Sequence, residues 1–338
     1  MKKVAFIGLE PIEKDYFRAQ LSEDEYQLLF LDTPVDIHTL DPEIEALSVF
    51  VSFNVTRDVI DLLPQLKLIA CRSTGYNNVD LDAAGERGIT VANTPGYGSS
   101  SVAEFAFGLI LMLSRKMNIV RRETADQEID RVAERGWDLD GKIIGIVGLG
   151  AIGRGVTKIA HGFGMKILAS DPNHDADFAA QYGVEFVDNL ERICREADVL
   201  TLHAPYRPEN HHLISNHLLS QMKPTALVIN TSRGELLNTL TLARMLQQNQ
   251  LGGAGLDVIE DESFLTDPNA VLELAATGDE QAIDKLKHAL AMLSLERMPN
   301  AIITNHNAFN TVEAIERINQ MTVENIAGIF DGGKVYSV

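Results

Sequence analysis

Short apolar segments alternate with longer mixed segments through the first 95 residues of the chain. A short apolar segment bounded by turn residues is typical of a strand buried on both faces. The mixed segment at residues 11–21 has helical spacing. The strands predicted in this part are residues 4–9, 26–31, 46–51, 66–70 and 90–92. Strands and helices in alternation predict a parallel sheet with helices on both faces.

The same alternation returns after residue 141 and continues almost to the end of the chain. Its apolar segments predict about six parallel strands, at residues 142–147, 165–170, 199–203, 226–230, 253–258 and 301–304. Residues 267–299 have a helical pattern and are long for a connector, so we interpret them as an insertion near the site. Residues 312–330 predict one long helix. The predicted fold class is α/β, with two doubly wound parallel-sheet domains.

A turn-rich stretch at residues 93–101 marks the first crossing between the two domains. Its glycines, proline and serines favour turns over packed elements. Ser101 and Glu104 then have the spacing of a capping box, which predicts the start of an apolar helix at residues 102–116. A polar helix is predicted at residues 121–135.

Composition narrows the classes of partner. The 338 residues carry a net charge of −19, which argues against binding to nucleic acid or to an acidic membrane surface. The two cysteines, Cys71 and Cys194, are far apart and suit a reducing compartment. The apolar run after Met1 stops at Glu10 with no cleavage site, so it predicts a strand and not a secretory signal. We therefore expect a cytoplasmic protein with no membrane partner.

The strand at residues 142–147 leads into a glycine-rich turn and then into a helix predicted at residues 152–161. In such a turn the first glycine permits a sharp bend, the second lets the backbone approach a pyrophosphate, and the third lets the helix pack on the strand. An acid ends the next strand, where a dinucleotide site places one against the ribose 2′-hydroxyl. These residues predict an NAD site made by Gly148, Gly150, Ala151, Ile152, Gly153 and Asp171.

Polar residues also follow four later strands. In an open α/β sheet the carboxyl ends of the strands form the edge where ligands bind, so these loops should face one cleft together with the glycine turn. The loops are residues 203–205, 231–234, 257–262 and 305–307. The additional cofactor-binding residues predicted from them are His203, Ala204, Pro205, Thr231, Ser232 and Asp257.

Four motifs, in order, resemble those of the D-isomer-specific 2-hydroxyacid dehydrogenases, and the resemblance covers almost the whole chain. The motifs are the glycine turn, residues 230–234, residues 255–258 with Glu262, and His306 with Ala308 and Thr311. The resemblance implies hydride transfer between NAD(H) and a small D-2-hydroxy acid or 2-oxo acid, and a homodimer. It also implies that a Rossmann NAD-binding domain, residues 100–305, is inserted into a flavodoxin-like substrate domain, residues 1–99 and 306–338.

The resemblance assigns three catalytic residues. Arg233 would hold the substrate carboxylate and polarise the carbonyl, His306 would exchange a proton with the substrate oxygen, and Glu262 would hydrogen-bond His306. These roles agree with the chemistry, because hydride addition leaves negative charge on oxygen, which a guanidinium stabilises and an imidazolium neutralises.

Substrate-binding residues are expected in the loop after the strand at residues 66–70 and at the first domain crossing. Ser73, Thr74, Gly75 and Tyr76 would offer backbone donors to the substrate carboxylate. Tyr97 would either line the pocket or have a structural role at the hinge.

The sequence departs from the family pattern at three places. Ser263 stands where the family usually has proline, and the linker at residues 135–142 looks shorter than in many relatives. Residues 306–311 resemble the D-lactate dehydrogenase branch, with an aromatic residue where other branches have glycine.

Two other classes of function stay open. A nucleotide-sensing binding protein similar to the corepressors of this fold is one, although the retained Arg233, Glu262 and His306 favour an enzyme. A formate- or phosphite-oxidising relative is the other, and Glu262 disfavours it because formate enzymes have glutamine there.

Three histidines, His211, His212 and His217, fall close together in the sequence. No carboxylate or cysteine lies nearby at ligand spacing, and the segment resembles the start of a helix. We predict no metal site.

Overall fold

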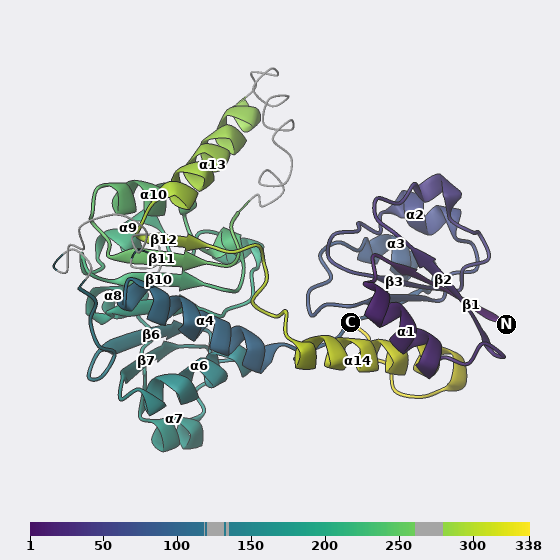
Figure 1. Ribbon diagram of the computed structural model, residues 1–338, viewed down its shortest axis with the longest axis horizontal. Coiled ribbons are helices and arrows are strands. Elements are labelled where there is room, and N and C mark those ends of the chain that lie inside the picture. Colours follow the sequence, from purple (N-terminus) through teal and green to yellow (C-terminus); the bar gives the residue numbers. More distant parts are fainter. Residues whose placement is uncertain (118, 120–131, 133–134, 261–279) are drawn as a thin grey trace, which may run out of the picture. The chain divides into compact units, whose positions relative to one another are not determined.

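The computed structural model describes residues 1–117, 119, 132, 135–260 and 280–338. The chain divides into two compact units, one made of Met1–Gly98 with Asn310–Val338 and the other of Ser99–Phe309 (Figure 1). Each unit is built on a parallel sheet, which confirms the predicted fold class. No helix in the described part of the chain is long and apolar enough to cross a membrane.

The first unit contains a five-stranded sheet in the order β2-β1-β3-β4-β5. This is the strand order of flavodoxin-like folds. The strands are β1 (Lys2–Ile7), β2 (Tyr26–Leu31), β3 (Ala46–Val49), β4 (Leu68–Cys71) and β5 (Thr90–Ala92). The helices are α1 (Pro11–Gln20), η1 (Ile37–Thr39), α2 (Arg57–Leu62), α3 (Leu81–Glu86) and α14 (Val312–Asp331).

Alternate residues of β1 point into the two halves of the core of this unit. Val4 and Phe6 pack with Phe17 of α1 and Ile326 of α14. Ala5 and its neighbours on the other face pack with residues of α2 and α3. This period of two explains why the whole strand is apolar, since helices cover both faces.

The second unit contains a sheet of seven described strands in the order β12-β11-β10-β9-β6-β7-β8. The order is that of a Rossmann fold with one strand added, and it reverses between β6 and β9. The strands are β6 (Ile143–Val147), β7 (Lys166–Ser170), β8 (Val184–Phe186), β9 (Val199–Leu202), β10 (Leu227–Asn230), β11 (Gly253–Leu256) and β12 (Ala301–Ile303).

Helices cover both faces of this sheet. On one face, residues of α4 (Ser99–Ser114), α6 (Ala151–Gly162) and α7 (Ala176–Tyr182) share a core with Ile144 and Ile146 of β6. The other face is covered by α8 (Leu190–Glu196), α9 (Asn216–Ser220), α10 (Thr239–Gln247) and α13 (Glu280–Arg297). The short helices η2 (Pro208–Asn210) and η3 (Gly234–Leu236) lie in the loops after β9 and β10.

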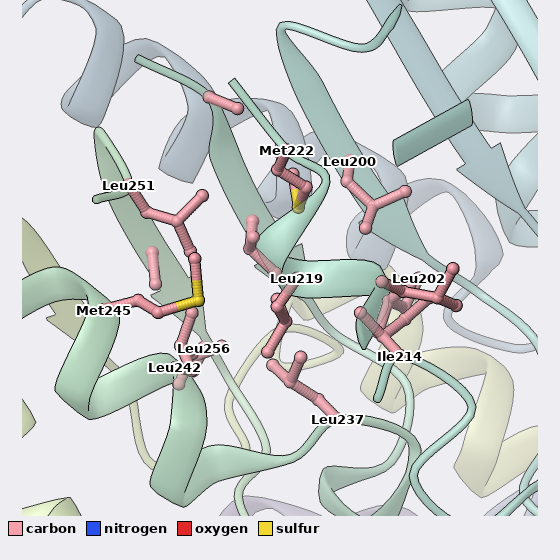
Figure 2. Packing of buried hydrophobic residues seen from close by; sticks show 14 of the residues in the cluster. Leu200, Leu202, Ile214, Leu219, Met222, Leu237, Leu242, Met245, Leu251 and Leu256 are labelled. Carbon is pink, nitrogen blue, oxygen red and sulfur yellow. The ribbon is translucent and has the colours of Figure 1, made fainter. Parts of the chain in front are cut away.

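Figure 2 shows the core on this second face, where side chains from strands and helices interdigitate. Leu200 and Leu202 of β9 and Leu256 of β11 meet Leu219 of α9 and Leu242 of α10 there. Each fully buried leucine stabilises the fold by about 1.5–3 kcal/mol relative to an exposed one. This packing fixes the strands whose carboxyl ends carry the candidate site.

Several predicted elements need correction. The sheet of the second unit has one strand more than predicted, because β8 is only three residues long and was missed. Helix α4 begins at Ser99, so Ser101 lies inside its first turn and is buried, and the prediction that Ser101 caps this helix is wrong. Of the predicted insertion, α13 lies within the described residues, whereas residues 267–279 lie outside them. Most of the polar helix predicted at residues 121–135 is also outside them.

Candidate active site

The glycine turn lies between β6 and α6, at the point where the strand order reverses. Gly148 has φ +93°, and a Cβ atom there would come within 2.5 Å of the backbone nitrogen of Ala204. A Cβ atom on Gly153 would overlap the carbonyl oxygen of Gly148. At Gly150, by contrast, a Cβ atom would meet no described heavy atom within 4 Å. Two glycines therefore serve close packing, while the third borders open space at the N-terminus of α6, which is suited to a pyrophosphate.

Asp171 follows β7 and lies against the glycine turn. Its Oδ2 atom accepts a hydrogen bond of 2.6 Å from the N–H of Leu149, and its Oδ1 atom accepts one of 2.8 Å from the N–H of Asn173. A carboxylate has about four acceptor positions, so further hydrogen bonds can still form. The side chain is held where a dinucleotide site places its ribose-binding acid.

Residues 203–205 follow β9, directly across the strand-order reversal. The His203 side chain is buried, and its Nε2 atom lies 2.8 Å from Thr201 Oγ1. Burial lowers the pKa of His203 to about 3, so the imidazole is neutral at physiological pH. Within the described residues its Nδ1 atom has no hydrogen-bond partner. Ala204 is half-buried beside Gly148, and Pro205 is exposed.

The loop that carries Arg233 is held by a fully buried residue, Asn230, at the end of β10. The Nδ2 atom of Asn230 donates to the carbonyl of Arg233 at 2.8 Å, and its Oδ1 atom accepts from the N–H and the hydroxyl of Ser232. Thr231 between them is buried. The guanidinium of Arg233 is half-buried and donates to the carbonyl of Ser232. Asn230 thus fixes the backbone on both sides of this cation.

Asp257, at the end of β11, holds the loop that carries His306. Its Oδ1 atom accepts hydrogen bonds from the Thr304 hydroxyl and the Asn307 N–H, and its Oδ2 atom accepts one from the Ala308 N–H. The backbone N–H of His306 donates to the Asp257 carbonyl at 2.9 Å. His306 has φ +49°, a left-handed conformation that is uncommon for a residue with a side chain. Asp257 therefore stabilises an unusual turn that orients the imidazole.

The two loops lie close together in the sheet. Strands β10, β11 and β12 are neighbours in that order, so Arg233 and His306 follow strands on either side of the one that leads to Asp257 (Figure 1). Glu262, the third predicted catalytic residue, lies outside the described residues.

Exchange of Asp257 for asparagine should disturb the turn that contains His306, although the His306 residue itself is unchanged. The amide keeps one acceptor oxygen but turns an NH₂ group toward backbone N–H donors, which leaves buried groups unpaired at a cost of about 1–3 kcal/mol. We expect kcat to fall roughly tenfold to a hundredfold and the midpoint of thermal unfolding to fall as well. Thr304→Val, which removes one of the three donors, is the control and should have a smaller effect on both. Equal kcat values for wild type and Asp257→Asn would show that Asp257 does not position His306.

The loop at residues 73–76 belongs to the first unit. The Ser73 hydroxyl donates to the Gly75 carbonyl at 2.6 Å, and the Asn93 amide donates to the Thr74 carbonyl at 2.8 Å. Within the part of the chain that the structure describes, the N–H groups of residues 73–76 donate to no protein acceptor. Consecutive backbone N–H groups without a protein acceptor are able to bind an anion. Tyr97 in the same unit is buried, and its carbonyl accepts a hydrogen bond from Arg317 of α14.

Sequence reasoning missed a buried cation directly before this loop. Arg72 is 2% exposed, and its guanidinium donates to the carbonyls of Ile7, Gly8 and Ser48. Burial lowers the pKa of Arg72 to about 10, against a smaller opposing effect of Glu13, and the side chain stays charged at neutral pH. The signal in the sequence is an arginine at the end of an apolar strand, where a buried position needs a partner.

A carboxylate lies beside the histidines at residues 211–212, which corrects the expectation that none is near them. Glu260 reaches the histidines although it lies 48 residues beyond His212, with 2.9 Å between His212 Nε2 and Glu260 Oε2. The possible ligand atoms of His211, His212 and Glu260 lie within 4.8 Å of one another. His212 Nδ1 accepts from the Asn238 amide, whose oxygen caps α10 by accepting from Thr241. The proton of His212 is therefore on Nε2, which donates it to Glu260. Hydrogen bonds thus connect Glu260, through His212 and Asn238, to the start of α10.

Comparison with known proteins gives the same family by three routes. Residues 107–308 match the family model described as "D-isomer specific 2-hydroxyacid dehydrogenase, NAD binding domain". The chain is 33% identical over 334 residues to the D-lactate dehydrogenase of Escherichia coli strain K12, covering 98% of this chain and 97% of that protein. It is 34% identical to 2-hydroxyacid dehydrogenase homolog 1 of Schizosaccharomyces pombe, covering 96% and 95%. The structure of D-lactate dehydrogenase from Aquifex aeolicus, complexed with NAD and lactic acid, superposes with a TM-score of 0.80 at 31% identity, covering 97% and 96%.

Proposed function

The chain belongs to the D-isomer-specific 2-hydroxyacid dehydrogenase family, and we propose that it reduces a small 2-oxo acid of the size of pyruvate to the D-2-hydroxy acid. Family membership makes it an NAD-linked oxidoreductase that transfers a hydride between a 2-hydroxy acid and a 2-oxo acid. The observation that carries the proposal is the pair of loops after β10 and β12, on either side of β11, which hydrogen bonds from Asn230 and Asp257 hold and which present Arg233 and His306 at one edge of the sheet.

NAD, when bound, supplies or accepts the hydride. The glycine turn would hold its pyrophosphate at the N-terminus of α6, and Asp171 would bind the adenosine ribose. The open space at Gly150 supports this placement. The neutral, buried His203 and the loop at residues 231–232 would complete the cofactor site.

During reduction the carbonyl carbon of the substrate accepts a hydride and its oxygen gains negative charge. Arg233 would stabilise this charge and grip the carboxylate, because a guanidinium offers two parallel donors. His306 would donate a proton to the oxygen, and Glu262 would orient the imidazole and favour its protonated form. In the opposite direction His306 would accept the hydroxyl proton.

The N–H groups of residues 73–76 would bind the substrate carboxylate. They are free of protein acceptors among the described residues, and the buried charge of Arg72 directly precedes them, which favours an anion. Tyr97 would contribute to the pocket wall. The preference for a small side chain is supported by relatives named D-lactate dehydrogenase and by the aromatic Phe309 after His306.

The test is a panel of 2-oxo acids of increasing size, with NADH consumption as the readout and the configuration of the product determined by chiral chromatography. We expect the highest kcat/KM with pyruvate or a 2-oxo acid one or two carbons longer, and a D product. An L product, or no turnover of any 2-oxo acid by folded protein that binds NADH, would overturn the proposal. The latter result would favour a nucleotide-sensing binding protein.

The cofactor preference should depend on Asp171. Its carboxylate would accept hydrogen bonds from the ribose hydroxyls of NAD and would repel a 2′-phosphate. Asp171→Ala should lower kcat/KM for NADH and raise it for NADPH, each by roughly tenfold or more, since hydrogen bonds to charged groups contribute about 1.5–3 kcal/mol. A preference that this substitution leaves intact would show that Asp171 does not bind the ribose.

Glu262→Gln should move the pH dependence of reduction. The substitution removes a negative charge that favours the protonated imidazole, so the acid required for reduction should be lost at a lower pH than in wild type. The measurement is kcat/KM for the 2-oxo acid between pH 5 and pH 9, expected to show the alkaline limb displaced toward acid. If the profile does not move, Glu262 is not the partner of His306.

We also propose a cytoplasmic homodimer that interacts with neither nucleic acid nor membranes. The sparse cysteines support the location, the acidic net charge argues against both of these partners, and the dimer is implied by the resemblance to the family. Light scattering coupled to size-exclusion chromatography should give twice the mass of one chain.

A further inference from the structure

Arg154 lies in the first turn of α6, directly after the glycine motif. Its Nη1 atom is 2.8 Å from the Asp175 Oδ2 atom, and its Nε atom donates to the Leu149 carbonyl at 3.3 Å. The guanidinium carbon lies 4.6 Å from the centre of the Phe178 ring. The side chain is about one-third exposed, so this cation faces both solvent and the loop after β7.

The two carboxylate oxygens of Asp175 have different partners. One oxygen pairs with Arg154, and the other accepts a hydrogen bond of 3.0 Å from the N–H of Phe178 as the N-cap of α7. The Phe178 N–H and then the Arg154 guanidinium hold the pKa of Asp175 below its usual value, so the carboxylate is charged at neutral pH. The ion pair is therefore intact under the conditions in which the enzyme would work.

The ion pair lies beside the predicted ribose site. Leu149 connects the two, because its N–H donates to Asp171 and its carbonyl accepts from Arg154. A 2′-phosphate on a ribose held by Asp171 would thus approach Arg154, which is the kind of side chain that binds phosphate with two parallel hydrogen bonds.

We propose that Asp175 is a second determinant of cofactor selectivity, which holds Arg154 in an ion pair and so withholds it from a 2′-phosphate. The proposal rests on the proposed binding of the ribose by Asp171. Arg154 pairs with Asp175, and Asp171 accepts from the N–H of Leu149, whose carbonyl accepts from Arg154. The remaining ionisable group in the loop, His174, lies 3.4 Å from Asp188. Removal of Asp171 alone would relieve its repulsion of a 2′-phosphate. Removal of both Asp171 and Asp175 would also leave Arg154 free to bind that phosphate.

The experiment compares four proteins: wild type, Asp171→Ser, Asp175→Ser, and the double variant. Serine is chosen at position 175 because it keeps an N-cap for α7 but is too short to reach Arg154. Binding of 2′,5′-ADP and of 5′-ADP is measured by calorimetry, since the two probes differ by the 2′-phosphate and require no turnover. Thermal unfolding verifies that each variant is folded, and Asp175→Asn replaces Asp175→Ser if the serine variant is not.

We expect the double variant to bind 2′,5′-ADP at least about tenfold more tightly than Asp171→Ser does, as a new charge-assisted hydrogen bond would allow. The gain should be absent for 5′-ADP and should shrink as ionic strength rises. Adding Arg154→Gln to the double variant should abolish it. The kcat/KM for NADPH should likewise be higher for the double variant than for Asp171→Ser, and adding Arg154→Gln should remove this difference.

Two results would overturn the proposal. One is equal affinity of the double variant and Asp171→Ser for 2′,5′-ADP. The other is a gain that survives Arg154→Gln, which would mean that Asp175 acts only through its own charge. Failure of the proposed function is distinguishable, because it would appear as absent turnover of 2-oxo acids while the nucleotide affinities are still measurable.

Discussion

His306→Ala should reduce kcat for 2-oxo acid reduction by roughly 10²–10⁴-fold, the range that a positioned acid or base contributes. The imidazole is the group assigned to proton transfer, and its backbone is fixed by Asp257 in a left-handed turn at the end of β12. Affinity for NADH, measured by fluorescence titration, should stay within a few-fold of wild type, since no role in cofactor binding is assigned to this side chain.

The backbone conformation of His306 calls for a second variant. Alanine is disfavoured at φ +49°, so part of any loss in His306→Ala could come from a rearranged loop. Asparagine tolerates the left-handed region and cannot act as a general acid, so His306→Asn should retain the loop and lose the rate. His217→Ala, on an exposed side chain that pairs with Glu191, serves as a matched control and should keep wild-type activity. A decrease in NADH affinity that matches the decrease in kcat would contradict the assigned role.

The central strands could be predicted well because β3, β4, β9 and β10 are buried along their whole length and read as short, mostly apolar runs. The predicted boundaries of β2 and β5 agree with the structure, and those of β1 and β11 differ by two residues at one or both ends. Strand β8 could not be found in this way, because Val184-Glu185-Phe186 is short and carries a charge at its centre.

The sequence indicated candidate site residues near the carboxyl ends of strands, and the structure places Asp171, Arg233 and His306 within three residues of such ends. The sequence could not predict which side chains hold the loops of the site in place through hydrogen bonds. Asp257 was predicted to bind the cofactor, and the sequence did not indicate that its carboxylate oxygens accept hydrogen bonds from residues 304–308. Contacts of this kind join loops that lie about fifty residues apart, and short-range spacing carries no information about them.

The same limit explains the two cations that sequence reasoning passed over. Arg72 is visible as a charged residue after β4, but only the structure shows that its guanidinium donates to backbone carbonyls of β1 and β3. Arg154 was visible as well, but its pairing with Asp175 depends on how α6 and the N-terminus of α7 meet. Charge in a sequence can be counted, whereas its partners are fixed by tertiary structure.

Arg233→Lys should be nearly as damaging as Arg233→Ala, with kcat/KM for the 2-oxo acid reduced by roughly 10²–10³-fold in both, the effect of removing one donor to a developing oxyanion. Lysine keeps the charge but loses the planar fork that can bind a carboxylate through two parallel hydrogen bonds. The loop itself should stay in place, because Asn230 holds the Arg233 carbonyl and Ser232 through contacts that do not involve the guanidinium.

The control for this substitution is Arg244→Lys, on the exposed face of α10, which should leave kcat/KM near wild type. Added guanidinium ion should restore part of the activity of Arg233→Ala and little of that of Arg233→Lys, since the lysine ammonium would occupy the space and repel a second cation. If Arg233→Lys retains most of the wild-type kcat/KM, Arg233 acts only as a distant charge, and the carboxylate of the substrate must be held chiefly by the N–H groups of residues 73–76.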